Sequence, residues 1–414
     1  MKTIKLFLFS CITLLFISCE SDENNNNGTA VFAVAEVKSL ADIRNSVEVT
    51  SARQTQSDGK VYVAENYIFY IAKEEGVHIF DNSNPASPQN VAFINIEGVH
   101  DIAVKGNRLY ADNYIDLVVF DISNFSDISV VQTLPNAFTF YPVYPEGAEY
   151  YDYSVTAGPD ELVTGFRLEM RDRPSGDYTD IAVGGNGEFA NGADGVGTGG
   201  SYARFQINSD ALYTVDSYQL NVFNIADSED VFFDKAVYLN EWLGGGQFET
   251  LFQQKDFLFV GSTNGMYIAN AEDEFNPYFV SGFSHATACD PVVVQGTKAY
   301  ITVRGGSTCG AIEDQVNVID IADISNPSLI STYLLDQPYG LGIYGQALYV
   351  CCGPGGLKVF DATGSELVLQ NSYSDEVTDV IPMDSHLIAV GSGTIRQYSY
   401  GPNFTLVPIS VLTF

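Results

Sequence analysis

Hydrophobic and polar residues alternate in short runs along most of the chain, and one stretch shows the pattern most clearly. Asp101–Val104, Leu109–Asp112 and Leu117–Ile122 each have the composition and period of two that are typical of a β-strand. Lys105-Gly106-Asn107 predicts a turn between the first two strands, and Asp121–Asn124 predicts another after the third. The stretch therefore predicts three consecutive strands.

The same unit recurs, and an apolar pair, usually with an aromatic second member, marks its second strand. The pair occurs at Phe69-Tyr70, Leu109-Tyr110, Leu212-Tyr213, Leu258-Phe259, Ala299-Tyr300, Leu348-Tyr349 and, in weaker form, Ile388-Ala389. Successive pairs are 40, 103, 46, 41, 49 and 40 residues apart. Five of these six spacings match the repeat of roughly 40–50 residues that is typical of a four-stranded propeller blade.

A third strand of one pattern follows each pair. Leu117–Asn124 reads Leu-Val-Val-Phe-Asp-Ile-Ser-Asn, and Val316–Asp323 reads Val-Asn-Val-Ile-Asp-Ile-Ala-Asp. Several copies then turn through Asn-Pro, as at Asn84-Pro85, Asn276-Pro277 and Asn326-Pro327. These copies resemble the LVIVD repeat of bacterial and archaeal surface proteins, over about Val61 to Tyr400. The resemblance implies a repeat propeller of the kind found in surface lipoproteins of the Bacteroidetes. It implies no ligand, because that family has no single established activity.

Seven marks predict an all-β fold, a seven-bladed β-propeller with one long loop insertion. A single blade cannot bury both faces of its sheet, whereas blades stacked in a ring can. Six or eight blades are the alternatives, because the 103-residue spacing has room for a degenerate blade. We expect one propeller domain over residues 31–414, closed by pairing of Ser46–Arg53 with the last blade near Phe404–Leu412.

The long spacing predicts the insertion. Val130–Leu134 suits the outer strand of the second blade, which leaves residues 135–200 as the inserted segment. It contains an aromatic cluster, a predicted hairpin at Leu162–Arg173 and a glycine-rich run at Gly184–Gly200. If first strands are innermost, the loops leading into them and the loops joining strands two and three emerge on one face. We call this the mouth face, and we expect the insertion on it.

The N-terminal residues predict where in the cell the protein is located. Lys2 and Lys5 precede the apolar run Leu6–Ile17, which is shorter than the roughly 20 residues that a transmembrane helix needs. Phe16-Ile17-Ser18-Cys19 resembles a lipobox, so we expect a signal peptide over residues 1–18 and a lipid on Cys19. A polar, acidic tether follows over residues 19–30 and resembles the segments that send such lipoproteins to the outer cell surface. The alternative is a simple secreted protein.

The net charge of the chain excludes some classes of binding partner. The net charge is −33, which argues against nucleic acid and against anionic lipid headgroups as ligands. The expected partners are a glycan or an envelope or extracellular protein, with membrane attachment only through the lipid on Cys19.

The mouth face holds the candidate site, because binding residues concentrate on long loops that a rigid scaffold supports. Aligning back from the seven marks gives the expected ligand-binding residues: His100, Asp101, Arg204, Trp242, Glu249, His285, Asp290, Tyr339 and Asp379. Such a ring of acids with one Arg suits a polar ligand or a cation. The sequence predicts no cofactor other than a calcium ion at this ring of acids, and it does not indicate which residues would bind the ion. The alternative is that these side chains cap the first strands and bind channel water.

The aromatic cluster supplies two further candidates, Tyr150 and Tyr151. Together with Glu146, Glu149 and Asp152 they resemble a sugar-stacking platform. The alternative is that the aromatic residues anchor the insertion on the propeller.

The cysteines outside the signal peptide and Cys19 are Cys289, Cys309, Cys351 and Cys352. Outside the cytoplasm they favour disulfides. Cys289 and Cys309 belong to the same end of one predicted blade, so we expect them to pair. For Cys351-Cys352 a strained vicinal bridge, free thiols and redox use all stay open.

Sequence motifs for catalysis are missing. The four histidines, His78, His100, His285 and His386, fall on different blades, and neither His-Glu-x-x-His nor Cys-x-x-Cys occurs. The first hypothesis is therefore a non-catalytic binding or adhesion module that uses the mouth face. The alternatives are a polysaccharide hydrolase or lyase at the channel mouth, and a structural scaffold of an outer-membrane complex.

Overall fold

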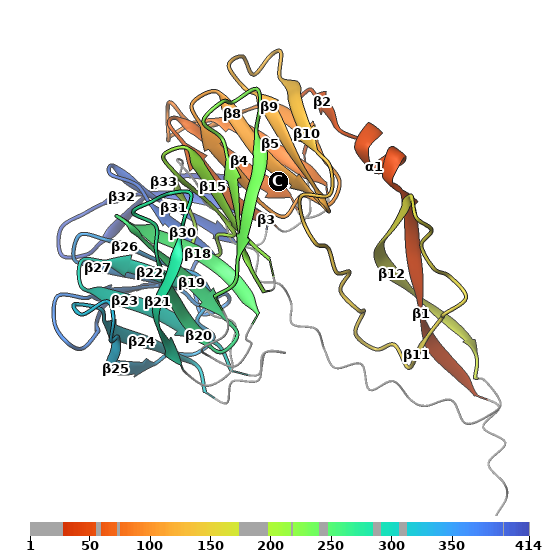
Figure 1. The fold of residues 1–414 in the computed structure, drawn as a ribbon. Coiled ribbons are helices and arrows are strands. Elements are labelled where there is room, and N and C mark those ends of the chain that lie inside the picture. The colour runs from red at the N-terminus through yellow and green to blue at the C-terminus, as the bar shows by residue number, and fades with distance from the viewer. Residues whose placement is uncertain are drawn as a thin grey trace, which may run out of the picture.

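The chain is described here by a computed structural model that covers residues 28–54, 59–72, 75–173, 198–216, 218–239, 247–284, 291–305, 313–391 and 393–413. These residues are almost entirely β-structure, with one short helix, α1 (Leu40–Asn45) (Figure 1). Among them no helix is long and apolar enough to cross a membrane.

Seven antiparallel sheets, each built on four consecutive strands, form the blades. Blades 1 and 2 contain β3 (Gly59–Ala64), β4 (Tyr67–Ala72), β5 (Gly76–Asp81), β6 (Gln89–Asn95), β7 (Ile102–Lys105), β8 (Arg108–Asn113), β9 (Asp116–Asp121) and β10 (Ser129–Leu134). Blades 3 and 4 contain β14 (Phe205–Asn208), β15 (Ala211–Val215), β16 (Leu220–Asn224), β17 (Phe232–Val237), β18 (Phe248–Gln254), β19 (Phe257–Ser262), β20 (Gly265–Asn270) and β21 (Tyr278–Ser284). Blades 5 to 7 contain β22 (Val292–Gln295), β23 (Lys298–Val303), β24 (Gln315–Asp320), β25 (Ser328–Leu334), β26 (Leu341–Tyr344), β27 (Ala347–Cys351), β28 (Leu357–Asp361), β29 (Val368–Tyr373), β30 (Asp379–Pro382), β31 (His386–Gly391), β32 (Thr394–Tyr400) and β33 (Leu406–Thr413).

This arrangement confirms the seven-bladed, all-β prediction and the register of the repeat. Every marking pair lies in a second strand, from Phe69-Tyr70 in β4 to Ile388-Ala389 in β31. Tyr70, Tyr110 and Tyr213 are completely buried, because the second strand is covered on both faces by neighbouring blades. The long spacing holds no further blade among the described residues.

The polar end of the repeat has a local cause. The Asp or Asn that ends the third strand accepts a hydrogen bond from the backbone N–H two residues on, as Asp81 does from Ser83 at 2.8 Å and Asp121 from Ser123 at 2.8 Å. This side chain fixes the turn into the fourth strand. A β-bulge between the third and fourth strands is also present in all seven blades and increases their twist.

The core lies between blades. Seven clusters of buried apolar residues each join two neighbouring blades, and together they run around the whole ring. Val61 and Tyr70 of blade 1 pack in one such cluster with Ile381 and Ile388 of blade 7. Side-chain packing therefore closes the ring.

The predicted closure by a shared strand is wrong. Within Ser46–Arg53, β2 (Glu48–Thr50) pairs with β6 and adds a fifth strand to the outer edge of blade 1. Blade 7 supplies its own outer strand, β33. Across the closure, Asn82 and Gln397 exchange side-chain hydrogen bonds of 3.1 and 2.7 Å, so a polar contact supplements the apolar packing.

The insertion contributes to a separate three-stranded sheet, which we call the arm. Its strands are β1 (Thr29–Ser39), β11 (Tyr150–Tyr151) and β12 (Glu161–Asp172), with β1 in the middle. Figure 1 shows the arm beside the ring of blades. The hairpin predicted at Leu162–Arg173 is wrong, because β12 is one long strand that pairs with β1 along its whole length. Gly165 lies at the bulge in this pairing.

Candidate functional site

The last three residues of the insertion and the four that follow it, residues 198–204, contact the inner strands of several blades, and we call this segment the plug. Its first part, β13 (Thr198–Gly199), pairs with the innermost strand of blade 1. Ser201 Oγ accepts a hydrogen bond from Leu341 N–H of blade 6 at 2.8 Å, and Ala203 O accepts one from Leu251 N–H of blade 4 at 2.5 Å. The plug thus links blades that are far apart around the ring.

Gly200 is required for this fit. A Cβ atom on this residue would lie 1.4 Å from Asp379 Oδ2, so the carboxylate of blade 7 occupies the space of a side chain. We expect Gly200→Ala to lower the free energy of unfolding by about 1–3 kcal/mol, the typical effect of overpacking. Urea denaturation measures it. Gly364→Ala is the matched control, since its nearest atom is 3.6 Å away, and equal losses in both variants would contradict the fit described here.

A buried charged cluster lies beside the plug. Lys60 Nζ is 3.2 Å from Asp101 Oδ2, and both side chains are almost completely buried. Asp101 also accepts hydrogen bonds from the N–H groups of Ile102 and Arg204, each at 2.8 Å. Burial raises the pKa of Asp101 and lowers the pKa of Lys60, because both ions lose hydration. The cluster therefore fixes polar atoms in place without exposing them to bulk water.

Asp112 extends this cluster toward the surface. Burial opposes its ionisation, but hydrogen bonds from the His100 ring and from the N–H groups of His100 and Asp101 hold its pKa below the ordinary value. The two amide bonds measure 2.7 and 2.8 Å, and His100 Nδ1 is 3.1 Å from Asp112 Oδ2. Asp112 is therefore a fixed anion next to a ring that stays partly exposed.

Asp379 has a different environment. It is 4% exposed, and its Oδ1 atom accepts hydrogen bonds from Ser201 N–H at 3.2 Å, Ser201 Oγ–H at 3.1 Å and Val380 N–H at 3.0 Å. Burial raises its pKa to about 7 despite these bonds and despite the positive charge of Lys60. Asp379 is the carboxyl group of the site that titrates near neutral pH.

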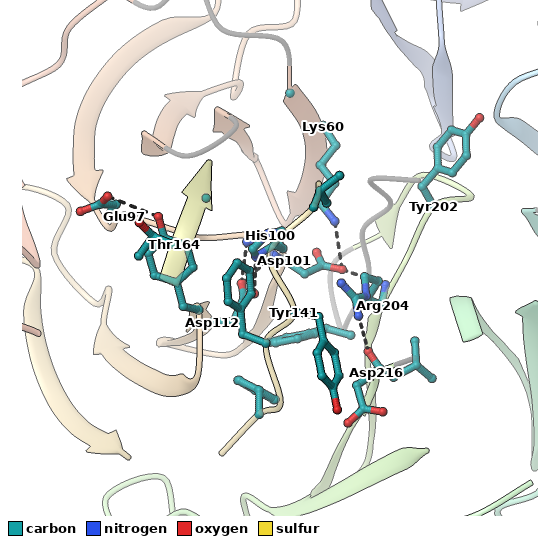
Figure 2. Close-up of a pocket in the computed structure, with 18 of the residues that line it drawn as sticks. Lys60, Glu97, His100, Asp101, Asp112, Tyr141, Thr164, Tyr202, Arg204 and Asp216 are labelled. Atoms are coloured by element: carbon teal, nitrogen blue, oxygen red, sulfur yellow. Dashed lines mark hydrogen bonds and ion pairs between the residues drawn. The ribbon is translucent and has the colours of Figure 1, made fainter. Parts of the chain in front are cut away.

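A cavity of about 870 Å³ opens over this cluster. Figure 2 shows Lys60, Asp101 and Arg204 meeting at its wall, with His100 and Tyr141 beside them. Its propeller residues lie at the starts of first strands and the ends of second strands, which is the geometry of the mouth face. The arm supplies a further wall through Glu36, Lys38 and residues 164–166, and Lys38 forms an ion pair with Glu97.

Aromatic rings line the rest of the cavity. Phe140 packs against Tyr114 and His100, with ring centroids 4.9 and 5.9 Å apart, and so anchors the start of the insertion. The next residue, Tyr141, is 59% exposed. On the opposite wall the guanidinium of Arg304 lies 4.3 Å from the ring centroid of Tyr339. The cavity thus offers one open aromatic ring between fixed polar groups.

The predicted site residues are partly brought together. His100, Asp101, Arg204, Tyr339 and Asp379 all line the cavity. Glu249 does not line it, because it is buried within β18. Trp242, His285 and Asp290 lie outside the described residues.

Tyr150 and Tyr151 also lie away from the cavity, on the arm. Tyr150 stacks on Phe32 at 5.2 Å, and Tyr151 packs edge-on against Phe166 at 5.6 Å, so both help to hold the arm sheet together. Their positions follow from pairing of β11 with β1, which the sequence pattern did not indicate.

The cavity residues that the sequence did not single out include Lys60, Asp112 and Arg304, whereas Tyr141 belongs to the aromatic cluster that was compared with a sugar-stacking platform. Asp112 and Arg304 end or follow second strands, so the rule that located the first-strand residues could have found them. No feature of the sequence marks Lys60 as a cavity residue, because Gly59-Lys60-Val61 is typical of the start of a half-exposed strand.

Within the described residues no three His, Cys, Asp or Glu side chains are grouped so that they could hold a metal ion. Cys351 and Cys352 are free thiols, both buried, and burial raises the pKa of Cys352 to about 11 and that of Cys351 well above its ordinary value. They are therefore inert packing residues. Cys19, Cys289 and Cys309 lie outside the described residues.

Comparison with known proteins supports the fold. The protein is similar to the periplasmic gluconolactonase of Pseudomonas aeruginosa, with 10% identity, a TM-score of 0.53 and coverage of 89% of this chain and 96% of that one. A protein from Lactobacillus plantarum has 12% identity, a TM-score of 0.53 and the same coverage. A putative 6-phosphogluconolactonase from Bacteroides uniformis has 11% identity and a TM-score of 0.50, covering 87% of this chain and 100% of that one.

At such identities the likeness shows the propeller fold alone. No curated protein matches the chain in sequence. The model of the LVIVD repeat matches residues 57–94, 98–134 and 288–334, which contain the four strands of blades 1, 2 and 5. The chain is therefore a seven-bladed repeat propeller that carries LVIVD repeats.

Proposed function

We propose that this protein is a binding module of the cell envelope that holds a neutral, hydroxyl-rich ligand, a glycan, in the mouth cavity. The observation that carries the proposal is the exposed ring of Tyr141 beside the half-buried His100 and Arg204, which the buried carboxylates of Asp112 and Asp101 hold in place. Sugar rings stack on flat aromatic faces, and their hydroxyl groups bind to carboxylates and guanidinium groups held in fixed positions. The cavity offers both kinds of contact.

The charges of the cavity favour a neutral ligand over an anionic one. Its lining contains seven carboxylates and four basic side chains: Glu36, Glu97, Asp101, Asp112, Asp216, Glu376 and Asp379, with Lys38, Lys60, Arg204 and Arg304. Lys38 and Lys60 face carboxylates, and Arg204 donates a hydrogen bond of 3.0 Å to Val215 O. An anionic sugar would therefore meet net negative charge with the bases already engaged.

The proposed address is the outer membrane, with the protein anchored through a lipid on Cys19 and facing the cell surface. The lipobox-like residues and the acidic tether support it, as does the net charge of −33, which suits exposure to solvent. An envelope or extracellular glycan would then reach the mouth face directly. A protein partner is the other ligand class that this address allows.

Tyr141 tests the proposal. A panel of neutral oligosaccharides screened by thermal shift should contain a stabilising ligand, since a ligand at about 100 times its Kd adds roughly 2.7 kcal/mol. Tyr141→Ala should weaken the Kd about tenfold, because one stacking contact is lost, and should leave the unliganded melting temperature unchanged. Isothermal titration calorimetry measures the change.

Tyr278→Ala is the matched control. Tyr278 is also 59% exposed, but it begins the outer strand of blade 4 on the face opposite the mouth. Equal weakening by both substitutions would count against the mouth cavity. A panel in which no sugar stabilises the protein would move the proposal to a protein partner.

A hydrolase or lyase acting on polysaccharide is the second candidate, and Asp379 is the observation that favours it. A carboxyl group with a pKa of about 7 at a cavity suits general acid or base chemistry. Its hydrogen bonds to the plug support a structural role instead. Release of new reducing ends from a bound polysaccharide, lost in Asp379→Asn, would support the enzyme; binding without turnover supports the binding module.

A further inference from the structure

The arm ends in a strand whose second edge is unpaired among the described residues. In the sheet order β11-β1-β12, β12 is an edge strand, and among the described residues only β1 pairs with it. Its twelve residues make it long for an edge strand. Long exposed edges present unpaired N–H and C=O groups that pair readily with another strand.

The backbone of β12 determines which residues offer those groups. Arg173, just after β12, donates its N–H to the O atom of Gly28, just before β1, at 2.8 Å, so the residues two and four positions before Arg173 also direct their backbone groups toward β1. The alternate residues, Phe166, Leu168 and Met170, therefore direct their N–H and C=O groups to the open edge.

The two faces of β12 have different characters. Leu168 and Met170 lie on an apolar face and are 48% and 73% exposed. Arg167, Glu169 and Arg171 alternate along the other face, where Glu169 forms ion pairs with both arginines. An occupant of the open edge must match an apolar face and a face of alternating charge at the same time.

We propose that the occupant is a second copy of β12, paired antiparallel about Leu168. In this register Leu168 faces Leu168 of the other copy, and Phe166 faces Met170. Arg167 faces Glu169, and the twofold symmetry makes this contact twice. All the edge-facing residues then form hydrogen-bonded pairs, and the two arms become one continuous six-stranded sheet.

Charge selects this register over its neighbours. Pairing centred on Glu169 sets Glu169 against itself, and pairing centred on Arg167 sets Arg167 against itself. Pairing centred on Met170 opposes Arg167 to Arg173. Like charges directly opposite each other destabilise a strand pair, whereas opposite charges stabilise it. Pairing about Leu168 opposes no like charges and sets Arg167 against Glu169 twice. Pairing about Phe166 is also free of like charges, but it opposes Glu161 to Arg171 only at the ends of the strand.

Cysteine substitution tests the register in the full chain. Leu168→Cys should give a disulfide-linked dimer under mild oxidation, because the Cα atoms of a hydrogen-bonded pair are about 5.5 Å apart, within the range that a disulfide spans. Met170→Cys is the control, since two copies of residue 170 would be roughly 13 Å apart along the strands. Met170 is the more exposed residue, so collision alone would favour its cross-linking. The unsubstituted chain, oxidised in the same way, measures the cross-linking that comes from the native cysteines.

Charge reversal tests the pairing without cysteine. Arg167→Glu should weaken dimerisation about tenfold or more, because two attractive contacts become repulsive, and Arg167→Glu combined with Glu169→Arg should restore it. Sedimentation velocity over a concentration series measures the dimer in both variants. A chain that stays monomeric, equal cross-linking at positions 168 and 170, or no rescue by the double variant would overturn the proposal.

Discussion

Asp101→Ala should destabilise the protein by about 3–5 kcal/mol, the range expected when one partner of a buried ion pair is removed. The substitution takes the carboxylate away from Lys60 Nζ, which it faces at 3.2 Å in a buried setting. It also removes the acceptor for the N–H groups of Ile102 and Arg204. Buried donors that lose their acceptor carry the full cost of desolvation. Urea denaturation gives the change in the free energy of unfolding.

An exposed ion pair provides the control for Asp101. Lys105 Nζ and Asp210 Oδ1 are 2.6 Å apart, but their side chains are 31% and 47% exposed. Asp210→Ala should therefore cost less than about 1 kcal/mol. A loss for Asp101→Ala no larger than that for Asp210→Ala would contradict the role of the buried cluster. Lys60→Met combined with Asp101→Leu should recover much of the stability, since an apolar pair replaces the ions.

Asp379 should make stability depend on pH between about 4 and 7. Its ordinary pKa is 3.8 and its pKa in the folded protein is about 7. Between these values the folded state holds one more proton than the unfolded state, so the free energy of unfolding falls as pH rises. The contribution is fully present below pH 4 and is lost by pH 7, about 4 kcal/mol over the interval.

Asp379→Asn isolates this effect, because the amide keeps an acceptor oxygen for Ser201 and Val380 and does not titrate. The stability of the parent protein relative to Asp379→Asn should fall steadily from pH 4 to pH 7 and then stay level. Taking the difference removes titrations that the two proteins share, including those of Lys60 and Asp101. Urea denaturation of both proteins at unit steps of pH measures it, and a difference that does not change with pH would show that burial does not raise the pKa of Asp379.

Local signals made the blades predictable. In blades 1 to 6 the Asp or Asn that ends the third strand follows the buried second-strand pair by 11 to 20 residues, and blade 7 keeps only the pair, so each blade could be located from its own sequence. The same register located His100, Asp101, Arg204, Tyr339 and Asp379 at the starts of first strands, where they line the cavity.

Long-range contacts were not predictable in this way. β2 pairs with β6 and β12 pairs with β1, and in both cases the partner is chosen by side chains far away in the sequence. Lys60 has the same difficulty, because its burial depends on Asp101 of the next blade and on the plug. A lysine at the start of a strand gives no sign that its ammonium group will be enclosed.

The plug also determines how the ring can assemble. It is encoded between blades 2 and 3, yet Ser201 binds Asp379 of blade 7, a residue 178 positions later in the chain. The hydrogen bonds between the plug and Asp379 can therefore form only after blade 7 has docked against the earlier blades. Because such distant contacts are slow to form, we expect docking of blade 7 to limit the folding rate. Docking of the plug and closure of the ring are then coupled, and a chain that lacks blade 7 loses the Asp379 contacts of its plug and keeps those with the other blades.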